Sequence, residues 1–314
     1  MTNTIDQLAR QLLTGEDKAF TIYSHKRPDG DTIGSAYALA LALQALGCRT
    51  QNLCSDAIPD VYRRLTDQVP AEAVEGAAGF SVDASTPERL GTYADAPIRY
   101  CIDHHEGNTI EAAYKYVDPG ASSCAQLVYA LIVRLGVEVT PLMAELLYTG
   151  LATDTNGFRT VSTNYDSLQT AAELVRCGAD PAAIAKRHFG TKSRKRMDAE
   201  QAIIDSFRYT HDGQILSAVL DYETRTRIGI DPNALEGINA LVDQVEGVRF
   251  GIVVREYAPK KCRISVRAAE GLRADLVCAQ FGGGGHRNAA GGEAVGDAET
   301  VRALVEAACE KELG

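Results

Sequence analysis

The stretch Phe20-Thr-Ile-Tyr-Ser24, with the polar turn His25-Lys-Arg-Pro-Asp-Gly-Asp31 directly after it, decides the fold. Its β-branched and aromatic residues are typical of a buried strand. An apolar run over 33–47 follows and is typical of a helix, with Thr32 as the expected N-cap. Strand, turn and helix are the repeating unit of an α/β sheet. We therefore expect the polar turn at the carboxyl edge of a parallel sheet, where such sheets bind ligands.

The same alternation continues along the chain and indicates two domains. In the first half, strand-like and helix-like runs follow one another at 79–83, 98–102, 122–135 and 141–152. Beyond residue 212 there are strand-like runs at 214–220, 249–255 and 262–267 and helix-like runs at 274–281 and 297–312. The fold class expected is α/β, with a mainly parallel, helix-flanked sheet in the first domain and a smaller α/β domain after it. We expect these domains over 1–190 and 213–314, joined by a linker helix over 191–212.

Composition places the chain among ordinary globular proteins. With 314 residues it exceeds the usual size of a single core, and it is 45% hydrophobic and 24% charged. Its eight cysteines include no Cys-x-x-Cys pair, which favours a reducing compartment over a disulfide framework. The amino terminus lacks the apolar core of a signal peptide, and the longest apolar run, over 36–47, is too short to span a bilayer. We therefore expect a cytoplasmic protein without a membrane segment.

The net charge of −10 restricts the binding partners. A protein that binds long duplex DNA needs a basic face to neutralise phosphates, so we expect no such partner. A short anionic substrate stays compatible with the charge, because carboxylates that hold divalent cations present a positive centre to a ligand.

Histidine and aspartate residues gather just after the expected strands. They are His25, Asp29, Asp31, Asp83, Asp103, His104 and His105, and Asp154 follows an expected helix. By itself each has an ordinary explanation, since Asp31 or Asp154 can cap a helix or turn and Asp83 can belong to a polar loop. Independent surface residues have no reason to share one sheet edge, whereas a two-metal centre requires it. The clusters contain no cysteine, so we expect two divalent cations, Mn²⁺ first, with Mg²⁺, Co²⁺ and Zn²⁺ as alternatives.

Four motifs and a glycine-rich run carry a family resemblance. They are His25-x-x-Pro-Asp-Gly-Asp-x-x-Gly-Ser35, Val82-Asp83, Asp103-His104-His105, Thr153-Asp154-Thr155 and Gly282-Gly-Gly-Gly-His286-Arg-Asn-Ala-Ala-Gly291. They resemble the successive motifs of the DHH phosphoesterase superfamily and the signature of its DHHA1 domain. Within the superfamily the chain is most similar to the nanoRNases, which are also 3′-phosphoadenosine-5′-phosphate (pAp) phosphatases. The resemblance implies a DHH catalytic domain followed by a DHHA1 substrate-binding domain.

The resemblance also implies a role for each residue of the cluster. It assigns His25 and Asp29 to one metal ion, Asp31 and His104 to the other, Asp83 to a bridging position and Asp154 to the completion of the site. It assigns Asp103 to the orientation of a histidine and His105 to the substrate phosphate. One segment departs from the pattern, because Val82-Asp83-Ala-Ser85 has small residues where relatives often have another acid or threonine. The departure concerns the surroundings of Asp83 rather than the ligand itself.

The second domain carries most of the expected substrate contacts. Successive glycines let a backbone approach a phosphate and donate several N–H groups. The expected contacts are Gly283, Gly284, Gly285, His286, Arg287, Asn288 and Arg267, together with Arg159 of the first domain. Ordinary alternatives are a core position for His286 and a solvated strand end for Arg267. The basic run over 186–196 either tracks a nucleic-acid backbone or forms a solvated face.

These features together predict a Mn²⁺-dependent phosphodiesterase for oligoribonucleotides of roughly two to five nucleotides and for small nucleotides such as pAp. The acidic net charge offers little long-range attraction to a longer strand. Alternatives within the superfamily are an exopolyphosphatase or pyrophosphatase, and a hydrolase of linear dinucleotides such as pApA. A nucleotide-binding sensor is the alternative outside the enzymes. The partners expected are short RNA or small nucleotides, and the sequence leaves a homodimer open.

Overall fold

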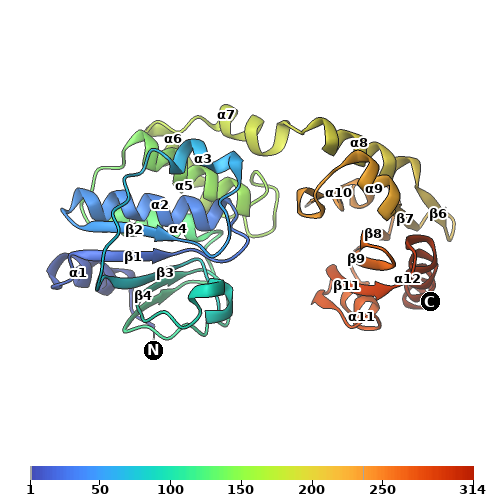
Figure 1. Cartoon of the computed structure of the whole chain (residues 1–314), viewed down its shortest axis with the longest axis horizontal. Helices are drawn as coiled ribbons and strands as arrows, with labels where there is room; N and C mark the ends of the chain where they lie inside the picture. Colours follow the sequence, from blue (N-terminus) through green and yellow to red (C-terminus); the bar gives the residue numbers. More distant parts are fainter. Residues whose placement is uncertain (1, 236) are drawn as a thin grey trace. The chain divides into compact units, whose positions relative to one another are not determined.

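The computed structural model describes residues 2–235 and 237–314 and forms two compact units, of which the first ends at Thr191 and the second begins at Lys192 (Figure 1). The first unit contains a parallel sheet and the second a separate sheet, so the expected α/β fold class is confirmed. Helix α8 (Arg194–Asp205) belongs to the second unit, where Ala199 and Ile203 are buried in a core with strand residues. The expected assignment of a catalytic domain to 1–190, a linker helix to 191–212 and a substrate-binding domain to 213–314 stays a prediction.

The first sheet has five parallel strands in the order β2-β1-β3-β4-β5. They are β1 (Ala19–Tyr23), β2 (Arg49–Leu53), β3 (Ala78–Val82), β4 (Ile98–Asp103) and β5 (Tyr114–Val117). From β1 the chain goes to β2 on one side and then to β3 on the other, so the strand order reverses between β1 and β3. Such a reversal opens a crevice at the carboxyl ends of the strands, where ligands bind in α/β proteins.

Helices α2 and α4 pack against this sheet, and α5 packs against both of these helices (Figure 1). The helices of the unit are α1 (Ile5–Thr14), α2 (Gly30–Ala45), α3 (Asp60–Thr66), α4 (Cys124–Arg134), α5 (Pro141–Asp154), α6 (Tyr165–Arg176), α7 (Pro181–Ala185) and the π-helical turn η2 (Lys186–Gly190). A smaller apolar cluster contains Leu90, from the 3₁₀ segment η1 (Pro87–Tyr93), together with Cys101 and Ile110. Thus η1 is anchored separately from the main helical layer.

Helices α2 and α5 approach each other closely because glycines line their contact. A Cβ atom on Gly34 of α2 would lie 2.2 Å from the carbonyl oxygen of Leu146 in α5. A Cβ atom on Gly30 would lie 2.2 Å from Oγ1 of Thr153, near the carboxyl end of α5. No side-chain carbon fits at such distances, so larger residues would separate the helices. The packing brings the first turn of α2 next to Asp154, the last residue of α5.

The second sheet has the strand order β10-β11-β9-β8-β7-β6, in which β7 and β8 are parallel and the other pairs antiparallel. Its strands are β6 (Arg208–Thr210), β7 (Ile215–Leu220), β8 (Phe250–Ala258), β9 (Lys261–Ala268), β10 (Gly284–His286) and β11 (Ala289–Val295). One apolar core involves α11 (Ala274–Ala279) and α12 (Ala298–Leu313), and another involves α8, η3 (Pro232–Leu235) and α10 (Ala240–Asp243), with α9 (Tyr222–Ile228) beside β8. Across the described residues, no helix is both long and apolar enough to cross a membrane.

Candidate metal centre and substrate contacts

The first turn of α2 places two aspartates at the carboxyl edge of the first sheet. Asp29 is the N-cap residue, and its Oδ1 accepts hydrogen bonds from the backbone N–H groups of Asp31 at 3.0 Å and Thr32 at 3.1 Å. The expectation that Thr32 caps this helix is wrong, because the Asp29 carboxylate occupies the capping position instead. The other oxygen, Oδ2 of Asp29, lies 3.5 Å from Nε2 of His25.

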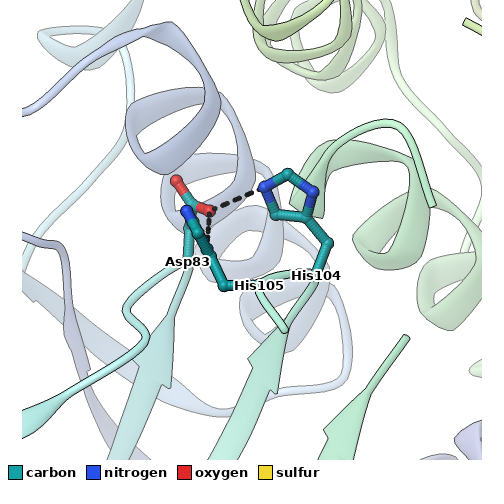
Figure 2. A group of neighbouring side chains, drawn as sticks. All are labelled: Asp83, His104 and His105. Carbon is teal, nitrogen blue, oxygen red and sulfur yellow. Dashed lines mark ion pairs between the residues drawn. The ribbon is translucent and has the colours of Figure 1, made fainter. Parts of the chain in front are cut away.

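Asp83 occupies the centre of the cluster. Its side chain follows β3 and is 2% exposed; its Oδ2 lies 3.5 Å from Nε2 of His25 and its Oδ1 lies 3.5 Å from Nε2 of His104. Figure 2 shows the ion pairs of Asp83 with His104 and with His105, whose Nδ1 is 3.7 Å from Oδ1. This oxygen is buried, and the described residues provide it with no hydrogen bond. A buried carboxylate oxygen without a donor is unfavourable, so the position fits a bound cation.

A second group of side chains surrounds His104. Its Nε2 lies 3.8 Å from Oδ2 of Asp31 and 3.5 Å from Oδ2 of Asp154. The amino end of α4 holds Asp31, whose carboxylate accepts hydrogen bonds from the N–H groups of Cys124 at 2.7 Å and Ala125 at 2.9 Å. The free N–H groups at a helix start suit a carboxylate, which explains this fixed orientation.

Asp103 and Asn108 orient His105. The Oδ1 atom of Asp103 lies 2.8 Å from Nδ1 of His105 and accepts the backbone N–H of His104, also at 2.8 Å. The amide of Asn108 donates to the other oxygen of Asp103 at 2.6 Å and to the carbonyl oxygen of Ala84 at 2.9 Å. These contacts fix the orientation of the His105 imidazole through its Nδ1 atom, and its Nε2 atom is left to contact another group. Sequence reasoning missed Asn108, because only the fold brings its amide between β3 and β4.

Crowded carboxylates dominate the electrostatics of the cluster. Burial and the charge of Asp154 raise the pKa of Asp31 to about 7, and burial with the charge of Asp29 raises the pKa of Asp154 to about 6. Burial and the charge of Asp31 raise the pKa of Asp83 well above its usual range. Burial opposes the charged form of His25, but hydrogen bonds and charges of Asp29 and Asp83 outweigh it and raise the pKa to about 10. Positive charge placed within the cluster would therefore stabilise the ionised carboxylates.

The donor set fits divalent cations that prefer oxygen and imidazole ligands. Ligand atoms lie within 4.8 Å of one another in three groups, which are His25 with Asp29 and Asp83, Asp31 with His104 and Asp154, and Asp83 with His104 and His105. Among the described residues, the ion-pair partners of these carboxylates are histidines, and no lysine or arginine neutralises them. Asp83 belongs to two of the groups and faces a different histidine with each oxygen, as a bridging carboxylate does.

The glycine-rich run forms an exposed hairpin in the second unit. Strand β10 pairs with β11, with His286 opposite Ala289, and the residues from Gly284 to Asn288 are exposed. The exposure of His286 excludes the alternative that it belongs to the core. A Cβ atom on Gly283 would lie 2.0 Å from the carbonyl oxygen of Gly291, so this glycine also has a packing role in the hairpin.

Arg267 lies on the same face of the second sheet as His286. Ala289 is opposite both residues in the register of β9, β11 and β10, and residues opposite each other in antiparallel strands project to the same side. Two strand spacings separate the two residues by about 10 Å. The hydrogen bond found for the Arg267 guanidinium goes to the carbonyl oxygen of Val266 at 3.2 Å, which leaves most of its donors for a ligand.

Arg159 and the basic run are partly engaged within the fold. The exposed Arg159 donates through Nε to the carbonyl oxygen of Asn156 at 2.9 Å, in the loop after α5. In the run over 186–196, Lys192 and Arg196 form ion pairs with Glu200 at 2.7 and 2.8 Å. These contacts give both features a structural role, whether or not they also contact a substrate.

Comparison with known proteins identifies the family. Residues 19–151 match the DHH family, N-terminal domain, and residues 212–311 match the DHHA1 domain. The chain is 30% identical to the bifunctional oligoribonuclease and PAP phosphatase NrnA of Thermus thermophilus, over 91% of this chain and 87% of that protein. It is 23% identical to the NrnA of Bacillus subtilis, over 92% of this chain and 94% of that protein. The chain therefore belongs to the DHH family and carries a DHHA1 domain, as the sequence motifs predicted, and these relatives are phosphoesterase hydrolases by name.

Solved structures agree with this fold. An exopolyphosphatase-related protein from Bacteroides fragilis superimposes with a TM-score of 0.86 and 26% identity, covering 98% of this chain and 96% of that one. An exonuclease RecJ bound to manganese superimposes with a TM-score of 0.51 and 15% identity, covering 99% of this chain and 94% of that one. At that low identity, the second similarity supports the fold alone.

Proposed function

We propose that the protein is a metal-dependent phosphodiesterase that hydrolyses short oligoribonucleotides and small nucleotides such as pAp. The observation that carries the proposal is the buried Asp83 carboxylate, which faces His25 with one oxygen and His104 with the other. Relatives that match over most of their length are named oligoribonuclease and PAP phosphatase, which supports the substrate class.

The ligand assignment follows the groups of neighbouring side chains. His25, Asp29 and Asp83 would hold one divalent cation, and Asp31, His104, Asp154 and Asp83 would hold the other. Two such cations would lower the pKa of a water molecule and stabilise charge on phosphoryl oxygens. Oxygen and imidazole donors favour Mn²⁺, with Mg²⁺, Co²⁺ and Zn²⁺ as alternatives.

His105 acts on the substrate as a donor. Its hydrogen bond to Asp103 raises the pKa of the imidazole, so the ring keeps its second proton to a higher pH than a free histidine. The contact through Nδ1 leaves Nε2 to donate a hydrogen bond to a phosphoryl oxygen or a proton to the leaving alkoxide. Asp103 has a pKa below its usual range, since bonds from His105 and Asn108 outweigh the effect of burial, so it stays an acceptor.

The hairpin and Arg267 recognise a terminal phosphate. The N–H of Gly283 donates to the carbonyl oxygen of Cys278 at 3.0 Å, so Gly283 supports the hairpin instead of donating to the phosphate. The proposed contacts are the backbone N–H groups of Gly284 and Gly285, the side chains of His286, Arg287 and Asn288, Arg267 on the same face and Arg159 in the first unit. The residues from Gly284 to Asn288 and Arg159 are exposed, which supports this role because a phosphate can reach them without rearrangement of a core. A guanidinium binds phosphate oxygens in a bidentate manner, which favours a terminal phosphate over a neutral group.

One substrate panel tests the proposal. The purified protein with Mn²⁺ is assayed on pAp, pApA, a 5-mer RNA, a 24-mer RNA and inorganic pyrophosphate. We expect pAp and the short oligomers to be hydrolysed with higher kcat/KM than the 24-mer, because the acidic protein attracts a long strand only weakly. Similar efficiency on the 24-mer would indicate a processive exonuclease. The absence of Mn²⁺-dependent turnover on every compound would indicate a nucleotide-binding sensor.

A second candidate function is hydrolysis of phosphoanhydrides or of a linear dinucleotide. The similarity to an exopolyphosphatase-related protein favours the former, and 25% identity to the cyclic-di-AMP phosphodiesterase PdeA of Listeria monocytogenes favours the latter. PdeA is the weaker guide, since this chain covers 45% of it. Pyrophosphate or pApA as the best substrate of the panel would replace pAp and short RNA in the proposal.

A further inference from the structure

Arg89 is a partly exposed residue whose side chain has no partner among the described residues. Among residues 2–235 and 237–314, none forms a hydrogen bond or an ion pair with its side chain. The backbone is well held, because the N–H of Arg89 donates to the carbonyl oxygen of Thr86 at 3.0 Å. The five N–H donors of its guanidinium are therefore available to a ligand.

A backbone hydrogen bond links Arg89 to the loop that carries His25 of the candidate metal centre. The N–H of Lys26 donates to the carbonyl oxygen of Arg89 at 2.7 Å, and Lys26 directly follows His25. Arg89 therefore lies beside the loop that carries His25 and Asp29.

The segment that carries Arg89 is built to hold this place. Gly91 has a φ of 63°, and a Cβ atom there would lie 2.2 Å from Oγ of Ser55, so only glycine allows η1 to come this close to the loop after β2. Leu90, between these residues, is 1% exposed and packs with Ile110 and Cys101. Arg89 therefore belongs to a packed segment next to the site rather than to a free loop.

We propose that Arg89 binds the nonbridging oxygens of the phosphoryl group that is hydrolysed. The proposal rests on the proposed phosphodiesterase function. The cluster of aspartates repels an anionic phosphodiester, and Arg89 supplies a fixed positive charge with bidentate hydrogen-bonding geometry at the edge of that cluster. Because it contacts the reacting group, Arg89 acts on every phosphoester that the site hydrolyses, monoester or diester, whereas Arg267 and His286 act only on substrates with a terminal phosphate.

Two substrates and two variants test this distinction. With Mn²⁺, kcat/KM is measured for pAp and for bis-p-nitrophenyl phosphate in the wild type, Arg89→Gln and Arg89→Lys. Arg89→Gln should lose about 10²-fold on both substrates, the size expected for one transition-state donor. Arg89→Lys should recover part of the loss, because it restores charge without the bidentate geometry. Arg99→Gln is the matched control, since Arg99 forms an ion pair with Asp17 at the amino end of β4 and should leave both rates unchanged.

Two binding measurements separate a phosphate contact from a structural effect and from the proposed function itself. Mn²⁺ binding, followed by electron paramagnetic resonance, should be the same in Arg89→Gln and the wild type. Inorganic phosphate should bind the Mn²⁺-loaded variant about tenfold more weakly in calorimetry, as loss of a charge-assisted hydrogen bond predicts. Equal phosphate affinity, a loss confined to pAp or a loss of Mn²⁺ binding would each overturn the role of Arg89. If the wild type hydrolyses neither substrate, the proposed function fails and phosphate affinity alone decides for or against Arg89.

Discussion

The carboxyl edge of the first sheet and the glycine-rich hairpin of the second differ in how they expose their polar groups. At the first sheet, Asp31, Asp83 and Asp103 are each at most 2% exposed, whereas His286 and its neighbours in the hairpin are exposed. Buried carboxylates are stable only with compensating positive charge and hydrogen bonds, so that edge favours the binding of positive charge. An exposed backbone needs no such compensation, and it gains only a modest free energy when it binds an anion. The difference suggests that the chemistry resides in the first region and part of the recognition in the second.

Removal of the central ligands is the strongest test of this comparison. Asp83→Asn and His104→Ala should each lower Mn²⁺-dependent turnover of bis-p-nitrophenyl phosphate by more than ~10³-fold, beyond the loss of a single donor, because each removes a proposed cation ligand. Circular dichroism melting should show that both variants stay folded, since Asp83→Asn also removes a buried charge. Substantial residual activity in both variants would show that the ligand assignment is wrong.

His105 separates substrate chemistry from metal binding within the first region. His105→Ala should lower kcat by ~10²- to 10⁴-fold, the usual contribution of a positioned acid. Its Mn²⁺ stoichiometry in equilibrium dialysis should match that of the wild type, because the groups around His25 and His104 remain intact. Loss of a metal ion on this substitution would make His105 a ligand instead.

Asn108 tests whether hydrogen bonds behind the site matter. Asn108→Ala removes a hydrogen-bond donor to Asp103. Asp103 then orients His105 less firmly, so turnover should fall by about 10- to 100-fold. Without this donor the pKa of Asp103 rises, and the acidic limb of the pH–rate profile should move to higher pH. A lower rate with an unchanged pH profile would point to a general packing defect.

Substitutions in the second region should depend on the substrate. Arg267→Ala and His286→Ala should lower kcat/KM for pAp by about 10- to 100-fold, as loss of a charge-assisted hydrogen bond predicts, while bis-p-nitrophenyl phosphate is hardly affected. Arg227→Ala, on the exposed side of α9, serves as the control for loss of a positive charge in the same unit. Equal losses on both substrates would assign Arg267 and His286 to the metal centre or to the fold.

The smallest expected effect is on the pH dependence of Tm in the cation-free protein. Because burial and Asp154 raise the pKa of Asp31 to about 7, the folded state binds a proton that the unfolded chain releases near pH 4. The stability from this proton is complete at low pH and is lost as the pH rises through 7. In EDTA, Tm should therefore fall between about pH 4 and 7, and Asp31→Asn should flatten this slope. An identical slope in the variant would exclude Asp31 as its source, and Mn²⁺ should raise Tm more at pH 8 than at pH 6.

Three of the strands that sequence reasoning missed have weak strand patterns. Strand β2 mixes polar and apolar residues, and β10 and β11 are rich in glycine and alanine, which have low strand propensity. Their structure comes from hydrogen bonding to neighbouring strands, and a single sequence shows no trace of that pairing. The predicted helices and strands were found because their apolar periodicity reports burial directly, although α1 and β5 carry similar patterns and were not predicted.

The sequence by itself determined the α/β class, the family and the side chains at the sheet edge. Each histidine and aspartate follows an apolar strand or helix, and that local order suffices to expect them together. Only the tertiary structure decided which atoms meet, so that Asp83 faces two histidines, Asp29 rather than Thr32 caps α2, and Asn108 reaches Asp103. These outcomes depend on the strand order and on the packing of α2 against α5, which join residues far apart in the chain. Local patterns record the burial of each residue, whereas its partners are set by contacts that form only when the whole sheet assembles.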